Sequence, residues 1–328
     1  MSGVYQESAP LRVGVSALFD PADTPHARTF LRALCVARNL LPSLNTVQWL
    51  FLDDGADAVR SAEVAQRMVE WKADVIIGHF SSDAALGAAG LYEQAGIPLL
   101  TPAATIDRLT LEHANVFRGC PSDRQLASDL LDWLIARRWT VLHIEADASA
   151  HGQALAAGIA TKVHQAGLRL VADREQAQVE VFAGRLRASR RHWHARRSAG
   201  SRRPLVLTDD AASPELGAAC VTDVNSYVIG FGAPQGFRCA AATHYRTLFD
   251  GTPDTYFRES LLMLHVLARL AERPVIDGVQ RRQQLLHALR QSCFETPLGE
   301  ARFEQGECQG AFSQVWRVGP TRLLPLSG

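Results

Sequence analysis

The chain of 328 residues has no excess charge of either sign and no long apolar segment. It contains 34 lysines and arginines against 34 aspartates and glutamates, which gives a formal net charge of +0. A neutral chain has no general attraction to nucleic acid or to an anionic membrane. No window is apolar for long enough to span a bilayer. We therefore expect neither a nucleic-acid partner nor a membrane span, and the length suits two domains.

Recognisable catalytic and metal-binding motifs are also missing. The sequence has no C-x-x-C, no P-loop and no G-x-S-x-G, and the glycines of GFGAPQG have the wrong spacing for a dinucleotide-binding loop. His192 and His194 have the spacing of metal ligands on a strand, but no further ligand pattern accompanies them. We predict that the protein is not an enzyme and uses neither a cofactor nor a metal. Its scattered cysteines are expected to be reduced thiols: Cys35, Cys120, Cys220, Cys239, Cys293 and Cys308.

The N-terminus lacks the features of an export signal. MSGVYQESAPLRVGVSALF has no basic segment that leads into an apolar core and a cleavage site, and its first apolar run is typical of a strand. We expect a cytoplasmic protein as the sequence stands. If an export signal is missing from this chain, the expected location is the periplasm.

What the sequence does contain is a regular alternation of apolar strands and helices. The strands are apolar throughout instead of alternating, which indicates a parallel sheet covered on both faces. The pattern restarts after Pro121, so we predict two doubly wound α/β lobes. Between the segments 168–173 and 204–210 we predict a long, basic helical stretch. The predicted strands of the first unit are residues 11–19, 47–54, 74–79 and 97–101, and those of the second unit are 140–147, 168–173, 204–210 and 225–232.

Two small polar loops follow neighbouring strands of the first unit. GHFSSD (78–83) offers hydroxyls and free backbone N–H groups at the start of a helix, which suit an anion. In TPAAT (101–105), Pro102 stiffens the loop and exposes the Ala103 carbonyl and the Thr105 hydroxyl. Donors on one loop and acceptors on the next suit a zwitterion such as an amino acid. The alternative, which the residue chemistry by itself favours, is that both loops are ordinary connections with capping residues.

The stretch from Asp53 to Thr105 resembles the leucine/isoleucine/valine-binding proteins, the solute receptors of branched-chain amino acid ABC transporters. The resemblance is carried by the DD after the second strand, by IGH-x-x-S, and by Y-E-x-x-G-I-P-x-x-x-P-A-A-T. It implies the type I periplasmic-binding fold, with two Rossmann-like lobes and a ligand cleft between them. The expected boundaries are 1–121 plus 237–310 for lobe one, and 122–236 plus 311–328 for lobe two.

The same resemblance implies a set of ligand-binding residues in lobe one. Ser82 is expected to donate to the ligand carboxylate through its side chain and its backbone. Ala103 is expected to offer its carbonyl, and Thr105 its hydroxyl and its N–H group. Phe80 is expected to form an apolar wall beside the ligand. The implied ligand is a small amino acid or a close analogue.

The chain departs from the family pattern where lobe two and the first loop reach the ligand. His151 stands where relatives often have a tyrosine before glycine, and His26 stands in the first loop. The usual acidic partner of the ligand ammonium is missing, and Asp209 or Asp210 can replace it. A turn or capping role for these two aspartates is equally compatible with the sequence. Ala56 and Ser81 replace the cysteines that some relatives pair, which agrees with a reducing compartment.

Several uses of such a cleft remain open from the sequence. The resemblance favours solute capture for an ABC permease, and the N-terminus favours a cytoplasmic sensor that acts on a regulatory protein. A third possibility is an accessory or scaffold protein with an altered pocket. The basic segment Arg185–Arg203 is either a docking patch or a solvated part of lobe two, and we favour the solvated helix.

Overall fold

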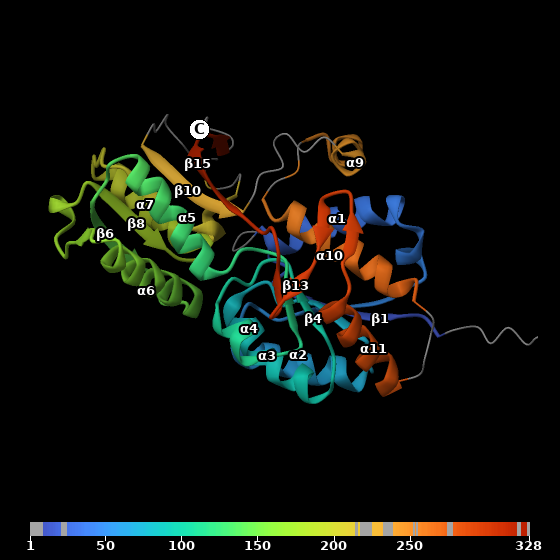
Figure 1. Ribbon diagram of the computed structural model, residues 1–328. Helices are drawn as coiled ribbons and strands as arrows, with labels where there is room; N and C mark the ends of the chain where they lie inside the picture. The colour runs from blue at the N-terminus through green and yellow to red at the C-terminus, as the bar shows by residue number, and fades with distance from the viewer. Residues whose placement is uncertain are drawn as a thin grey trace, which may run out of the picture.

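A computed structural model gives the positions of most of the chain. Two separate lobes, each built around one large sheet, lie side by side (Figure 1). Among the residues that the structure describes, no helix is long and apolar enough to cross a membrane. The described residues are 9–20, 25–213, 216, 225–231, 239–251, 253, 255–273, 278–319 and 323–326.

The first sheet, which defines lobe one, has seven strands. In sheet order they are β13 (Phe303–Glu304), β14 (Glu307–Cys308), β5 (Val116–Arg118), β4 (Leu99–Thr101), β3 (Val75–Gly78), β1 (Arg12–Ala17) and β2 (Gln48–Asp53). Strands β1 to β5 are parallel, β14 joins β5 in parallel, and β13 runs antiparallel to β14. The central strands are buried along their whole length because helices cover both faces.

The helices of lobe one form a layer on each face of this sheet. On one face α1 (His26–Leu40) packs against α10 (Phe257–Ala271), and on the other α2 (Ala58–Glu70) packs against α3 (Ser82–Gln94) (Figure 1). The remaining elements of this lobe are η1 (Pro42–Asn45), α4 (Arg108–Glu112), α9 (Ala240–Phe249), α11 (Gly278–Gln291) and the hairpin of β11 (Phe294–Thr296) and β12 (Gly299–Ala301).

The second sheet, which defines lobe two, also has seven strands. In sheet order they are β16 (Leu323–Pro325), β15 (Ser313–Val318), β10 (Ser226–Phe231), β9 (Leu205–Leu207), β8 (Val179–Ala183), β6 (Val141–Ala146) and β7 (Arg169–Leu170). Strands β6 to β10 are parallel, and β15 and β16 continue the sheet in antiparallel order. Its helices are α5 (Asp123–Ala136), α6 (Ala150–Gln165), η2 (Arg174–Gln176), α7 (Leu186–Ser198) and η3 (Asp209–Ala211).

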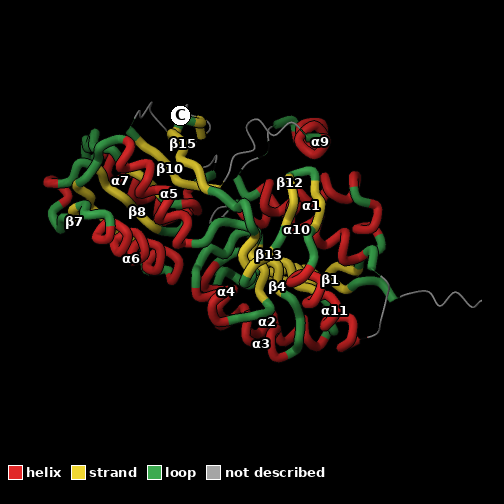
Figure 2. Tube along the Cα trace, viewed as in Figure 1, coloured by secondary structure: helices red, strands yellow, loops and turns green. Residues whose placement is uncertain are grey.

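The two sheets share one topology. The order β2-β1-β3-β4-β5 in lobe one is repeated as β7-β6-β8-β9-β10 in lobe two, and Figure 2 shows the two groups of strands separated from each other. This is the doubly wound order whose ligand crevice lies at the carboxyl ends of the strands, beside the first strand. The predicted fold of two doubly wound α/β lobes is therefore confirmed.

The chain passes from one sheet to the other three times, after β5, after β10 and after β14. The exact lobe boundaries given from the sequence stay a prediction. The boundary between residues 236 and 237 lies outside the described residues.

The predicted helical stretch between residues 173 and 204 is wrong in its first part. Strand β8 lies there, in the middle of the second sheet, and α7 begins only at Leu186. The strand was not predicted because the charged Glu180 interrupts its apolar run. Glu180 is nevertheless buried, because Arg196 of α7 donates two hydrogen bonds to its carboxylate at 2.6 and 2.7 Å.

A buried glutamate in α10 makes the stability of the fold depend on pH. Burial raises the pKa of Glu259 from its ordinary value of 4.5 to about 7, against the opposing charge of Arg258. Between these two values the folded chain binds a proton that the unfolded chain releases. The free energy of unfolding contributed by this group therefore falls as the pH rises through that window.

We predict that Glu259→Gln removes this loss. At pH 8 the variant should unfold with a free energy roughly 2–3 kcal/mol higher than the wild type, and near pH 4.5 the two should match. Urea denaturation at both pH values measures the difference, with Glu272→Gln at the exposed end of α10 as the control. An unchanged pH dependence in Glu259→Gln would contradict the assignment.

Candidate functional site

The residues predicted from the sequence all follow the carboxyl ends of parallel strands. Because the two sheets have the same topology, these ends form the crevice edge of each lobe. His26 follows β1, Phe80 and Ser82 follow β3, Ala103 and Thr105 follow β4, His151 follows β6, and Asp209 and Asp210 follow β9.

The half of the site in lobe one is buried, and hydrogen bonds from neighbouring residues hold its loops in place. Ser82, the first residue of α3, is 4% exposed and Thr105 is 1% exposed. Thr101 donates to the His79 carbonyl at 3.2 Å and so fastens the start of the β4 loop to the end of β3. The guanidinium of Arg118 donates to the Thr105 carbonyl at 2.7 Å. These contacts fix the loop before any ligand arrives.

His151 of lobe two lies directly against this half-site. Its Nδ1 is 3.1 Å from the hydroxyl oxygen of Thr105, and its Nε2 is 3.3 Å from Oδ1 of Asp209. Asp123, at the start of α5, approaches Nδ1 to 3.9 Å. Three of the predicted residues, Thr105, His151 and Asp209, are therefore brought together across the two lobes.

A second pair lies beside the first. His26 Nε2 is 3.2 Å from Oδ1 of Asp210. The ring of Phe80 lies 6.4 Å from the ring of His26, so Phe80 forms part of the wall. Tyr256 packs against His26 at 4.2 Å between ring centroids and donates to the Asp209 carbonyl at 2.7 Å.

The sequence analysis missed two members of this cluster. Tyr256 begins the amphipathic run that continues as α10, and it precedes this helix in a left-handed conformation with φ of 69°. Asp123 is the first residue of α5, directly after the cap residue Ser122. Neither residue carries a local sequence signal for a cleft, because both reach it through tertiary packing.

The cluster contains carboxylates and imidazoles, and their burial and mutual charges shift their pKa values. Burial raises the pKa of Asp123 to about 6, and His151 opposes the rise. Burial alone would lower the pKa of His151, but the surrounding carboxylates, Asp209 first, hold it well above its ordinary value. For Asp210, the charge of His26 outweighs burial and keeps the pKa at about 2. The cleft therefore contains carboxylate charge that faces imidazole groups.

A latch of direct contacts joins the lobes beside the cluster. Arg185, which precedes α7, contacts Asp83 of α3 at 2.7 Å and donates to the Ala56 carbonyl at 2.8 Å. It also donates to the Ser81 hydroxyl at 3.3 Å. The backbone N–H of Ala150 donates to Asp83 at 3.1 Å. These contacts hold the lobes in a closed arrangement.

Described residues of both lobes line one small cavity in the cleft. Its volume is about 20 Å³, enough for about one water molecule. The cavity is lined by Leu18, His26, Ala56, Phe80, Ser81, Arg185 and Asp210.

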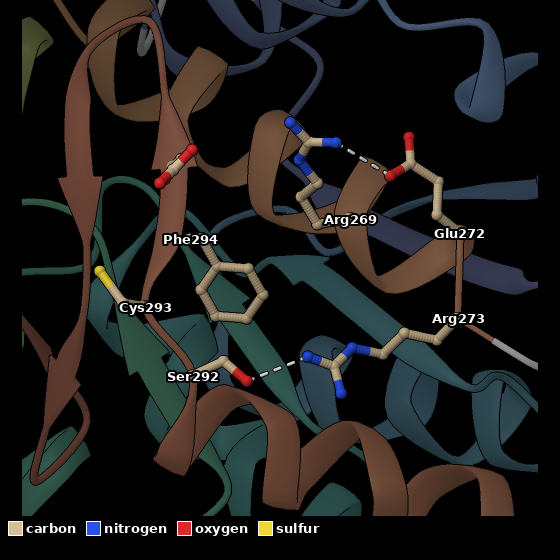
Figure 3. Close-up of a pocket in the computed structure, with 7 residues that line it drawn as sticks. Arg269, Glu272, Arg273, Ser292, Cys293 and Phe294 are labelled. Atoms are coloured by element: carbon tan, nitrogen blue, oxygen red, sulfur yellow. Dashed lines mark hydrogen bonds and ion pairs between the residues drawn. The ribbon is translucent and has the colours of Figure 1, made fainter.

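Larger hollows on lobe one contain none of the predicted residues. One, of about 410 Å³, lies beside the end of α10, where Arg269 contacts Glu272 and Arg273 contacts Ser292 (Figure 3). Another, of about 500 Å³, includes Thr110 and Phe303 near the start of β5. Neither hollow is a better candidate, since both lie away from the crevice edge of the sheet.

The arginine-rich segment is largely engaged within lobe two. Arg196 pairs with Glu180 of β8, and Arg203 contacts Glu175 at 3.3 Å. Arg197 donates to the Ser226 hydroxyl at 2.8 Å. These contacts favour the interpretation of this segment as a helix that stabilises lobe two.

Comparison with known proteins gives the same assignment for the fold. Residues 45–190 match the family model described as periplasmic binding protein. The structure superposes on the leucine binding protein from Thermotoga maritima with a TM-score of 0.83, over 97% of this chain and 98% of that chain, at 17% identity. This likeness shows the fold.

The curated relatives match a shorter part of the chain. An amino acid binding protein from Pseudomonas aeruginosa is 31% identical over 125 residues, which is 36% of this chain and 33% of the relative. The Leu/Ile/Val-binding protein from Escherichia coli K12 is 29% identical over 120 residues, 35% and 32% respectively. The chain thus aligns with about a third of the length of these relatives.

We predict that Arg185→Gln opens the protein. The change removes a charge-assisted contact worth about 2 kcal/mol, which shifts the ratio of closed to open molecules roughly 30-fold toward the open form. Small-angle X-ray scattering should then record a larger radius of gyration than for the wild type. Arg191→Gln, an exposed change of the same kind on α7, is the control, and equal radii for all three proteins would refute the latch.

Proposed function

We propose that the chain is a divergent member of the leucine/isoleucine/valine-binding type of periplasmic binding protein and that it binds a small amino acid or an amino-acid-like molecule between its lobes. The proposed role is that of the solute-binding protein of a branched-chain amino acid type ABC transport system. We infer a binding protein instead of an enzyme, since the relatives are binding proteins by name.

The position of Ser82, Ala103 and Thr105 carries this proposal. They follow β3 and β4, which are adjacent strands at the crevice edge, and all three are nearly fully buried. Ser82 begins a helix of 13 residues, whose N-terminus favours a carboxylate. The Ala103 carbonyl, one loop away, is the proposed acceptor for the ligand ammonium.

Lobe two supplies the proposed second half of the site. Asp209 is 1% exposed and lies on the far side of His151 from Thr105, so its carboxylate is placed to face a cationic group. In the closed form the hydroxyl of Thr105 is hydrogen-bonded to Nδ1 of His151. We therefore infer that a ligand enters an open form, takes over Thr105 and favours reclosure by its contacts with both lobes.

The tight closure of the cleft favours a second candidate function. The described residues enclose one cavity of about 20 Å³ in the cleft, and the lobes contact each other directly through Arg185 and His151. A protein of this kind suits an accessory or scaffold role, or a sensor whose closed form binds a regulatory protein. The transport role implies a periplasmic location, and the sensor role a cytoplasmic one.

We predict that Ser82→Ala combined with Thr105→Ala abolishes amino acid binding. Two hydrogen bonds to charged ligand groups are lost, which costs roughly 3–6 kcal/mol and removes micromolar affinity. Calorimetric titration with leucine, isoleucine, valine, threonine and alanine measures the effect. Thr161→Ala combined with Ser198→Ala removes the same hydroxyls from lobe two away from the cleft and is the matched control.

Two outcomes would contradict the proposal. If the cleft variant binds as tightly as the wild type, the carried-over residues are wrong. If the wild type binds none of these amino acids and its radius of gyration stays constant in their presence, the accessory role replaces the transport role.

A further inference from the structure

The cleft contains buried polar atoms whose bonding capacity is not used by neighbouring side chains. Among the described residues, neither carboxylate oxygen of Asp209 accepts a hydrogen bond, and Nε2 of His151 makes none. The Asp209 side chain is 1% exposed and that of His151 is 6% exposed. A buried carboxylate that lacks a hydrogen bond is costly unless a positive charge faces it closely. His151 Nε2 faces Asp209 Oδ1 at 3.3 Å without a hydrogen bond, so a cation that displaces the imidazole proton could bind both groups.

One pair of these donor atoms has the separation of ligands on a small metal ion, and a third donor lies close by. One donor atom each from His151, Asp209 and Asp210 lie within 4.8 Å of one another. Around a tetrahedral zinc ion with bonds of about 2.0–2.1 Å, neighbouring donor atoms are about 3.3 Å apart. The separation of His151 Nε2 from Asp209 Oδ1 is 3.3 Å. One imidazole nitrogen and two carboxylates form a donor set that suits a first-row transition metal.

The outer contacts of two of these residues also fit metal ligands. His151 is held at Nδ1 by Thr105, at 3.1 Å, which directs Nε2 toward Asp209. Asp210 is held at Oδ1 by His26, at 3.2 Å. Metal-binding imidazoles and carboxylates are usually oriented in this way through their other polar atom.

A second cluster of histidines and a carboxylate, on lobe two, is a weaker candidate for a metal site. His143 and His192 lie 2.9 and 3.5 Å from the oxygens of Glu145. Glu145 is already paired with Arg174, and His143 Nδ1 lies 3.0 Å from the Val171 carbonyl. The groups of this cluster are thus satisfied by one another.

We propose that His151, Asp209 and Asp210 bind a divalent first-row transition-metal ion, with zinc as the representative, between the two lobes. This goes beyond the proposed amino acid binding, and the ion and a ligand ammonium group are alternative cations for Asp209. It also revises the expectation from the sequence that the protein binds no metal. The ion joins lobe two to the Thr105 loop through His151.

The test is calorimetric titration of the full chain with ZnCl2 after removal of metals with EDTA, repeated with MgCl2. We expect one zinc ion per chain and no comparable binding of magnesium. Asp209→Asn and His151→Ala should each lower the zinc affinity at least about 100-fold. His192→Ala, which removes a histidine beside a carboxylate elsewhere, should leave it unchanged.

The possible results separate this proposal from its rivals. Loss of zinc binding in His192→Ala, with Asp209→Asn unaffected, would assign the ion to the cluster of His143, Glu145 and His192 and overturn the proposal. Absence of zinc binding by the wild type would overturn it as well. Circular dichroism checks that each variant is folded, and Asp209→Asn preserves the side-chain shape. Ser82→Ala tests amino acid binding separately, so either proposal can fail without the other.

Discussion

The contact of His151 with Thr105 joins the two halves of the candidate site, beside the latch of Arg185. It is the point where a side chain of lobe two reaches the loop that follows β4 in lobe one, at 3.1 Å. On its other side the same ring faces Asp209, at the carboxyl end of β9. One imidazole thus spans the crevice edges of both sheets. A ligand that uses Thr105 must displace this ring, and an ion that binds Nε2 must also meet Asp209.

The repeated topology explains why this contact forms at all. In both lobes the crevice lies beside the first strand, so the loops of one sheet face the loops of the other when the lobes close. The latch of Arg185 and Asp83 closes the same face at one side. Burial then concentrates carboxylate and imidazole charge in a medium of low polarity, where each unpaired group is costly. A cleft of this kind stays closed only while its charges are matched.

The sequence predicted most of the fold because its strands are apolar runs of a distinct length. The prediction failed at β8, where Glu180 interrupts the apolar run. The charge of Glu180 is paired with that of Arg196, which lies 16 residues later in α7. The site residues that directly follow strands were predictable, because the loops after parallel strands lie together at the crevice edge of a sheet. The contact between His151 and Thr105 and the entry of Tyr256 into the cleft depend on how the lobes close, and no local pattern encodes that.

The most direct test is a nitrogen-15 NMR spectrum of the histidine side chains, recorded alone, with a panel of amino acids, and with zinc. If the cleft is the binding site, the ring nitrogens of His151 shift when a ligand binds, and those of His192 keep their positions. The account is contradicted if the His151 signals stay unchanged with every amino acid and with zinc.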